Sequence, residues 1–156
     1  MTKPTLYMLI GIPASGKSTW VKTHGSEHIV LSTDNYIEEQ ARREETTYDA
    51  VFMKYINIAT NAMNEMVDVA TKLKCDVIWD QTNLDIRSRK RKMAKFRDYR
   101  KVAVVFEMPS DNVLKERLQS REGKVIPEKI IESMKQRFQY PSQEEGFDEI
   151  MVVKND

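Results

Sequence analysis

Residues 5–18, TLYMLIGIPASGKS, join a short apolar run to a loop that contains two glycines. The run Thr5–Ile10 is aliphatic, aromatic and β-branched, which is typical of a buried strand. The loop Gly11–Ser18 matches G-x-x-x-x-G-K-[S/T] at every fixed position. Helix-compatible sequence follows, from Lys17 to about Thr23. This order of strand, glycine loop and helix predicts a phosphate-binding loop.

The spacing of the loop has a physical reason. Its glycines allow a tight turn in which successive N–H groups point at phosphate oxygens, and the start of the helix adds positive potential. Lys17 is placed to reach the β- and γ-phosphates of a nucleotide, and the Ser18 hydroxyl to ligate Mg²⁺ bound to them. The alternative is an ordinary strand–turn–helix with an exposed lysine. The loop residues that we expect to bind ATP are Gly11, Ile12, Pro13, Ala14, Ser15, Gly16, Lys17, Ser18 and Thr19.

Apolar runs and helical stretches alternate along the rest of the chain. Four more runs are predicted strands, at His28–Leu31, Cys75–Trp79, Val102–Met108 and Ile150–Val153. The helices are expected as one long or two adjacent ones within Glu38–Lys74, at Ile86–Tyr99, after Pro109 and after Pro127. Strands that alternate with helices indicate a mostly parallel sheet covered on both faces. We therefore expect a three-layer α/β fold and a single domain over residues 1–156.

Composition narrows the class of protein. Lys and Arg total 25 against 24 Asp and Glu, so the net charge of +1 gives no global sign of a nucleic-acid binder. The lone Cys75 excludes an internal disulfide and a Cys-based zinc site. No apolar run approaches the roughly 18 residues of a membrane span, and the N-terminus lacks a signal-peptide cleavage pattern. We expect a cytoplasmic protein without a membrane partner.

Two carboxylates follow predicted strands, at the edge that forms the crevice of an open α/β sheet. Asp34 is placed either to accept a proton from an attacking hydroxyl, as a general base, or to N-cap the helix that follows it. Asp80 is placed to hold Mg²⁺ or its waters, or to accept hydrogen bonds from hydroxyls of the phosphate loop. Thr82 and Asn83 come next, and for both we favour a turn over a substrate contact.

Arg117 and Arg121 are four residues apart, so they share one face of a helix. They precede the polar stretch Glu122–Pro127, which is long enough to be a lid. Arginines delivered by a closing lid neutralise charge on a transferring phosphoryl group. The alternative is a solvated helix face, with Glu116 and Glu122 as partners.

In this order the segments resemble the kinase domain of polynucleotide 5′-hydroxyl kinases, of the phage and animal kinase–phosphatase type, within the small P-loop kinases. The resemblance covers nearly the whole chain. It includes GIPASGKSTW from Gly11, the Asp-x-Tyr at Asp34, the D-x-T-N at Asp80 and the paired lid arginines. It implies a P-loop kinase fold with an Arg-bearing lid. It also implies transfer of the γ-phosphate of ATP, with Mg²⁺, to the 5′-hydroxyl end of DNA or RNA, here without a phosphatase domain.

The resemblance also implies residue roles. Asp34 would act as the general base, Lys17 and Arg121 would stabilise the transferring phosphoryl group, and Arg117 would help to bind ATP. The residues then expected to bind the acceptor substrate are Thr33, Asp80, Thr82, Asn83 and Arg89. One departure is Ile37, where phage kinases carry an arginine that helps to bind the acceptor phosphate. Alternative functions are a kinase for a small molecule or a hydroxymethylated DNA base, and a non-catalytic nucleotide-binding module.

A strongly basic stretch follows the D-x-T-N segment. Between Arg87 and Lys101 nine residues are basic and only Asp98 is acidic. A helix of this composition predicts a surface that follows a phosphate backbone near the cleft. The alternative is a solvated face, with Phe96 and Tyr99 packing on the other side.

Overall fold

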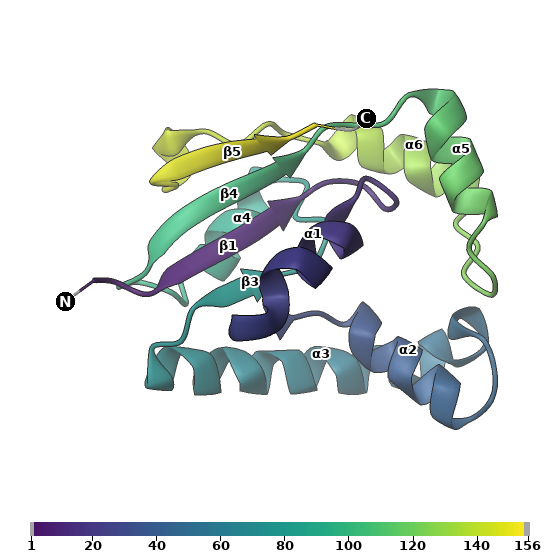
Figure 1. Cartoon of the computed structure of the whole chain (residues 1–156), viewed down its shortest axis with the longest axis horizontal. Coiled ribbons are helices and arrows are strands. Elements are labelled where there is room, and N and C mark those ends of the chain that lie inside the picture. Colours follow the sequence, from purple (N-terminus) through teal and green to yellow (C-terminus); the bar gives the residue numbers. More distant parts are fainter. Residues whose placement is uncertain (1, 155–156) are drawn as a thin grey trace.

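Five strands form one sheet in the computed structural model, which describes residues 2–154. Their order is β2-β3-β1-β4-β5, and every neighbouring pair is parallel (Figure 1). The strands are β1 (Thr5–Ile10), β2 (Ile29–Leu31), β3 (Val77–Trp79), β4 (Arg100–Phe106) and β5 (Glu149–Val153). Because all five run in the same direction, their carboxyl ends lie at one edge of the sheet.

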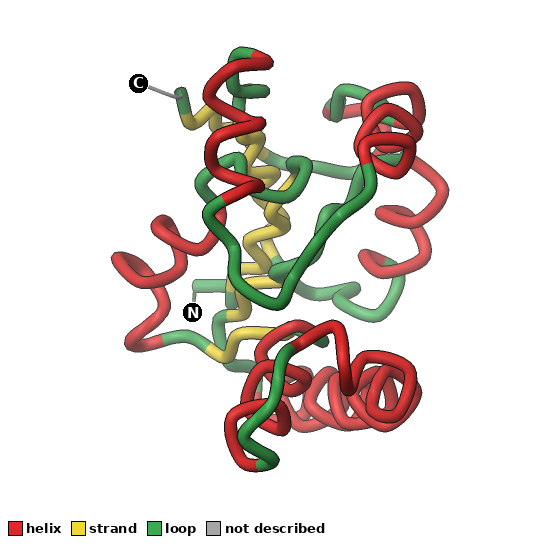
Figure 2. The backbone as a smooth tube through the Cα atoms, turned by 90° about the vertical axis from the view of Figure 1, so that its right-hand side faces the viewer, coloured by secondary structure: helices red, strands yellow, loops and turns green. Residues whose placement is uncertain are grey.

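Helices cover both faces of this sheet, as Figure 2 shows from the side of the carboxyl ends. The helices are α1 (Lys17–His24), α2 (Asp34–Arg43), α3 (Tyr48–Leu73), α4 (Ile86–Met93), α5 (Asp111–Gln119) and α6 (Glu128–Arg137), with short 3₁₀ turns at Gly25–Glu27 and Gln143–Glu145. The predicted three-layer α/β fold is confirmed. No helix within residues 2–154 has the length and apolar character needed to cross a bilayer.

Side chains of β1 point alternately to the two faces of the sheet, so the strand contributes to a hydrophobic core on each face. Leu6, Met8 and Ile10 are fully buried on the face that packs with α3 and α4. Leu9 is fully buried on the other face, where Trp20 of α1 packs. Since both faces of the strand are covered, β1 is a nearly continuous apolar run, as expected for a buried parallel strand. The phosphate loop therefore begins from the rigid centre of the sheet.

The stretch from Glu38 to Lys74 forms two helices rather than one, and the first begins earlier, at Asp34. Glu45 has a positive φ of 55°, a left-handed conformation that stops a helix. The Thr47 side chain then accepts a hydrogen bond from the Ala50 amide and caps α3. This turn places Tyr48, the first residue of α3, beside the start of α2.

The predicted helix Ile86–Tyr99 is too long, because α4 ends at Met93. Beyond this point the chain bonds in i→i+3 turns that bring Phe96 and Tyr99 into the core. The Phe96 ring meets Trp79 edge to face at 5.8 Å. The Tyr99 hydroxyl donates to the carbonyls of Ala70 and Cys75 at 3.0 and 2.6 Å. Burial of these two rings and the capping of α3 outweigh the helical pattern.

Candidate active site

The loop between β1 and α1 is built around two glycines. A Cβ at Gly11 would lie 2.7 Å from the Ser15 Oγ and 3.0 Å from the Phe106 Cβ, so a side chain there would displace Ser15 and crowd Phe106. Gly16 has a φ of +106°, which L-residues rarely adopt. The Lys17 ammonium donates to the carbonyls of Gly11 and Ile12 at 2.8 Å each. The loop thus wraps around the lysine that begins α1.

The residues of this loop fit a polyphosphate. The Ser15 hydroxyl is buried, with no hydrogen-bond partner among the described residues. The first turn of α1 carries no acidic residue, so no side chain neutralises the positive end of the helix dipole. Across residues 2–154 no group of three or more His, Cys, Asp or Glu is arranged to hold a metal ion. Ser18, in the first turn of α1, is the residue that would hold a Mg²⁺ ion here, and the ion would offset phosphate charge.

The predicted residues lie close enough to Lys17 to influence the pKa of its ammonium. Burial lowers the pKa of the Lys17 ammonium to about 8; Asp80 and Asp34 oppose this shift, and Arg121 and Lys124 add to it. Burial also raises the pKa of Asp80, against the attraction of Lys17. Side chains from the phosphate loop, the ends of β2 and β3, and the segment after α5 therefore act on one another at the carboxyl edge of the sheet.

Asp34 is the first residue of α2, and Thr33 occupies the N-cap position. The alternative that Asp34 is the N-cap is therefore wrong. Its Oδ1 accepts a hydrogen bond from the Tyr48 hydroxyl at 2.7 Å, and its Oδ2 pairs with the Lys124 ammonium at 3.0 Å. Its side chain is 52% exposed, so the carboxylate is held by two residues and still open to a ligand.

The turn after β3 supports the phosphate loop. The Asn83 side-chain amide donates to the Leu9 carbonyl at 2.7 Å, and the Gly11 amide donates to the Thr82 carbonyl at 3.0 Å. Asn83 is buried and has a φ of 48°. Its interpretation as a turn residue is thus supported, and its side chain binds protein groups rather than lying open to substrate. Thr33 is also buried, and its hydroxyl accepts a hydrogen bond from Gln81 at 3.3 Å.

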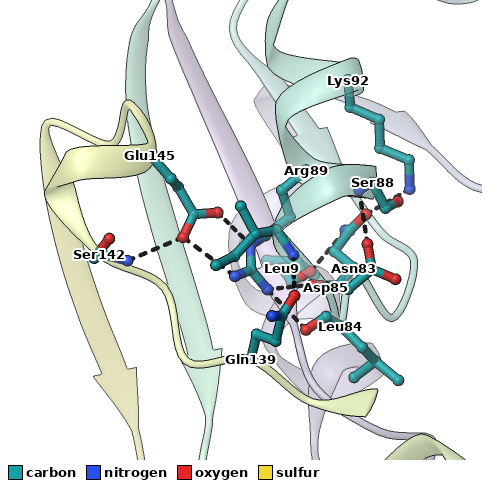
Figure 3. A network of polar contacts seen from close by, with 11 residues as sticks. Leu9, Asn83, Leu84, Asp85, Ser88, Arg89, Lys92, Gln139, Ser142 and Glu145 are labelled. Carbon is teal, nitrogen blue, oxygen red and sulfur yellow. Dashed lines mark hydrogen bonds and ion pairs between the residues drawn. The ribbon is translucent and has the colours of Figure 1, made fainter.

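The placement of Arg89 differs from the expectation that it binds substrate (Figure 3). Its side chain is fully buried and forms two hydrogen bonds with the Glu145 carboxylate, at 2.6 and 3.2 Å. Its remaining terminal nitrogen donates to the carbonyls of Asn83 and Leu84, at 2.9 Å each. No nitrogen of this guanidinium faces solvent. Arg89 therefore joins α4 and the β3 turn to the C-terminal segment.

Replacing Arg89 by methionine is expected to lower the free energy of unfolding by about 3–5 kcal/mol, because Glu145 is left buried without its partner. Urea unfolding measures this loss. The double variant Arg89→Met with Glu145→Met should recover most of it. As a control, Arg100→Met breaks the exposed Arg100–Glu149 pair and should cost less than about 1 kcal/mol. A small loss in the Arg89 variant would contradict the structural role.

The two lid arginines lie at the end of α5, with Arg117 in its last turn and Arg121 two residues beyond it. The Arg117 guanidinium donates to the Ala14 carbonyl of the phosphate loop at 3.0 Å. Arg121, just beyond the end of α5, acts electrostatically on Lys17. Figure 2 shows the connection between α5 and α6 crossing in front of the sheet. Both arginines therefore lie on the side of the phosphate loop.

Two residues of the site were given no role in the sequence analysis. Tyr48 and Lys124 both contact Asp34, although 14 and 90 residues of chain separate them from it. A tyrosine at a helix start and a lysine in a polar loop are common features, so no local signal pointed to their contact with Asp34. Their contribution depends on how α2, α3 and the lid pack together.

A cavity of about 270 Å³ adjoins the phosphate loop on the side of β4 and β5. Its lining combines loop residues with apolar and aromatic side chains, namely Gly11, Ile12, Val105, Phe106, Glu107, Met108, Phe138, Tyr140 and Val152. Aromatic and apolar walls suit a flat, weakly polar ring. The cavity therefore has the position and chemistry for the base of a nucleotide whose phosphates lie in the loop.

Comparison with known proteins agrees with this geometry. The human heterogeneous nuclear ribonucleoprotein U-like protein 2 is 28% identical over 155 residues, which cover 92% of this chain and 20% of that protein. The L-seryl-tRNA(Sec) kinase of Methanococcus maripaludis is 26% identical over 147 residues, covering 92% of this chain and 56% of that protein. The chain thus spans about a fifth of the first relative and about half of the second.

The fold is also found in solved structures. A chain in the structure of the Pnkp1/Rnl/Hen1 RNA repair complex superposes with a TM-score of 0.68 and 24% identity, over 95% of this chain and 47% of that one. A family model described as an AAA domain matches residues 6–141, which include the phosphate loop, Asp34, Asp80 and both lid arginines. The chain has the fold of the P-loop kinases and belongs to this AAA domain family.

Proposed function

We propose that this P-loop kinase-like protein transfers the γ-phosphate of ATP to the 5′-hydroxyl end of a polynucleotide, with Mg²⁺ as cofactor. The observation that carries the proposal is the Asp34 carboxylate, partly open to solvent and in electrostatic reach of Lys17. A nucleotide-binding module has no need of a proton acceptor at this place, whereas a kinase for hydroxyl groups does.

The chemistry assigns one task to each side chain. Asp34 accepts the proton of the acceptor hydroxyl while the hydroxyl oxygen forms a bond to the γ-phosphorus. The bond to the β–γ bridging oxygen breaks, and its electron pair leaves with ADP. Lys17 and Arg121 stabilise charge on the transferring group, and Arg117 holds the donor side of the loop.

The surface of α4 supports a polynucleotide acceptor. Five basic residues on α4 and the following turn are exposed and form no ion pair within the described part of the chain: Arg87, Lys90, Arg91, Lys95 and Arg97. The Lys92 ammonium donates to Gln81 at 2.9 Å, and Gln81 donates to Thr33, the neighbour of Asp34. The basic surface therefore begins close to the proposed base, where a phosphate backbone would be neutralised.

The first test is transfer of labelled γ-phosphate from ATP, with Mg²⁺, to a 5′-hydroxyl oligonucleotide, beside its 5′-phosphorylated twin. Label on the hydroxyl form alone is the expected result. Label on neither, with ATP binding intact, would overturn the proposal. Matched RNA and DNA oligonucleotides then identify the preferred acceptor.

Neutralising the surface of α4 is expected to weaken acceptor binding selectively. In Arg87→Gln/Lys90→Gln/Arg91→Gln we expect the slope of log affinity against log salt to fall by about 2, at about 0.7 for each phosphate contact on a single strand. Acceptor KM should rise while kcat is kept. The control Lys3→Gln/Lys22→Gln/Lys72→Gln removes the same charge from exposed positions on other elements and should change neither. Equal slopes in both variants would contradict the role of α4.

A second candidate is a hydroxyl acceptor other than a polynucleotide end. The seryl-tRNA(Sec) kinase favours it, because that relative aligns over 92% of this chain. A kinase for a small molecule would be insensitive to salt and to competing oligonucleotide, whereas a hydroxyl carried on RNA would keep both dependences. The same labelling assay with these acceptors separates the two candidates.

A further inference from the structure

The lid loop, residues 120–127 between α5 and α6, is docked on the start of α3. The Asp49 amide donates to the Gly123 carbonyl at 2.9 Å, and the Val125 amide donates to the Asp49 Oδ2 at 2.8 Å. A Cβ at Gly123 would lie 2.5 Å from the Thr47 Cβ, and Gly123 has a φ of +68°. A glycine is therefore required for this close approach, which holds the lid loop against the helix.

Docking brings a lysine of the lid loop onto the proposed base. The Lys124 ammonium lies 3.0 Å from the Asp34 Oδ2 and 3.2 Å from the Glu38 Oε1. It also lies 4.4 Å from the centre of the Tyr48 ring, a cation–π contact. The Lys124 side chain is only 16% exposed. Two carboxylates and one aromatic face thus fix a single cation that comes from the lid.

Tyr48 holds the other oxygen of the same carboxylate. Its hydroxyl donates to the Asp34 Oδ1 at 2.7 Å. Burial, together with the Asp34 charge, raises the pKa of Tyr48 above its ordinary value, so the hydroxyl remains a donor at neutral pH. Each oxygen of Asp34 is therefore directed by a different element, Oδ1 by α3 and Oδ2 by the lid loop.

The segment that carries Lys124 also contacts the phosphate loop, where the phosphate donor would bind. Arg117 contacts the phosphate loop at Ala14, and Arg121 acts on Lys17. Residues 117–124 therefore bridge the phosphate loop and the start of α2 at the carboxyl edge of the sheet. Because this segment contacts both the donor side and Asp34, a small movement of it would misalign the reacting groups. A misplacement of about 1 Å costs up to ~100-fold in rate.

We propose that Tyr48 and Lys124 are positioning residues of the acceptor site, and that docking of the lid loop completes this site. The proposal rests on the proposed function, in which Asp34 accepts the proton of the acceptor. Lys124 directs the Asp34 carboxylate only while the lid loop is docked, whereas Tyr48 directs it at all times. One docking movement then assembles the base and brings the lid arginines to the phosphates, so transfer awaits a closed site.

The test compares four variants: Lys124→Gln and Lys124→Arg, Tyr48→Phe, and Asp49→Ala, which removes the acceptor of the Val125 amide and so weakens docking without touching Asp34. We expect Lys124→Gln and Asp49→Ala to lower kcat by roughly 10–100-fold, with ATP affinity within about twofold of the wild type. Lys124→Arg should recover most of the rate because it keeps the charge, and Tyr48→Phe should lose about 10-fold in kcat. The control Lys129→Gln, at an exposed position of α6, should match the wild type.

Hydrogen exchange of the lid loop amides tests docking without any acceptor. Faster exchange of residues 120–127 in Lys124→Gln and Asp49→Ala, with an unchanged Tm, supports the proposal; unchanged exchange overturns it. A fall in ATP affinity with full kcat in Lys124→Gln would also overturn it, because Lys124 would then belong to the donor site. If the wild-type protein phosphorylates no 5′-hydroxyl end, the proposed function fails, and the exchange result still decides whether the lid docks as described.

Discussion

Replacing Asp34 by alanine is expected to lower kcat for phosphoryl transfer by about 10²–10⁴-fold, the usual contribution of a general base. Nucleotide affinity should stay close to that of the wild type, because Asp34 lies on α2 and not in the phosphate loop. The measurement is steady-state transfer of labelled γ-phosphate, together with equilibrium binding of ADP. Asp34→Asn keeps the shape of the side chain but cannot take the proton, so it should be equally inactive.

The matched control is Glu38→Gln. Glu38 lies one turn further along α2, and its carboxylate also pairs with Lys124, at 3.2 Å. If the loss in the Asp34 variants came only from a missing partner for Lys124, the Glu38 variant would show a loss of similar size. Transfer that persists in Asp34→Ala would contradict the assignment of the base.

Replacing Lys17 by alanine is the second change with a large expected effect. It removes the ammonium that begins α1 and should lower kcat/KM by about 10²–10³-fold, the cost of losing one donor to the developing charge. Lys22→Ala removes an exposed charge from the same helix and should have little effect. Calorimetric titration with ADP, followed by the transfer assay, checks both variants. Equal losses of kcat/KM in Lys17→Ala and Lys22→Ala would mean that the effect comes from the net charge of the helix and not from the position of Lys17.

The lowered pKa of Lys17 predicts that the affinity for nucleotide depends on pH. Its pKa is lowered to about 8 by burial, whereas phosphate oxygens beside it favour the charged form. Above pH 8 the complex with nucleotide therefore binds more protons than the free protein, so affinity should fall as pH rises through this value. Below pH 7 Lys17 is charged in both states and adds no pH dependence. Titration with ADP between pH 7 and 9.5 measures the slope.

The parts of the fold that follow from short-range patterns were predicted well. β1, the phosphate loop and α1 are read from one continuous stretch, because the conformation of a glycine loop depends on the residues within it. Strand positions were close, since a strand buried on both faces is an apolar run. The end of α4 was misplaced because Phe96 and Tyr99 leave the helix to enter the core, and that gain depends on residues far along the chain.

The sequence predicted some residues of the candidate site and misplaced others. Asp34 and Asp80 were expected near the phosphate loop because carboxyl ends of parallel strands meet at one edge. The lid arginines were expected there because they share one helix face just before a polar stretch that could close as a lid. Arg89 was expected there from the resemblance, as a basic residue shortly after the D-x-T-N segment. Its burial depends on Glu145, which lies 56 residues further along the chain, and no local sequence pattern predicts that ion pair.

By itself, the sequence determined a P-loop α/β protein, because the strand, the glycine turn and the lysine lie within 14 consecutive residues whose backbone conformation is set locally. Only the tertiary structure decided which charges are available for chemistry. Arg89 is neutralised inside the protein, whereas Lys124 crosses from the lid to Asp34. The reason is physical: the effect of a charge depends on its burial and its partners, and packing brings those partners together across long stretches of chain.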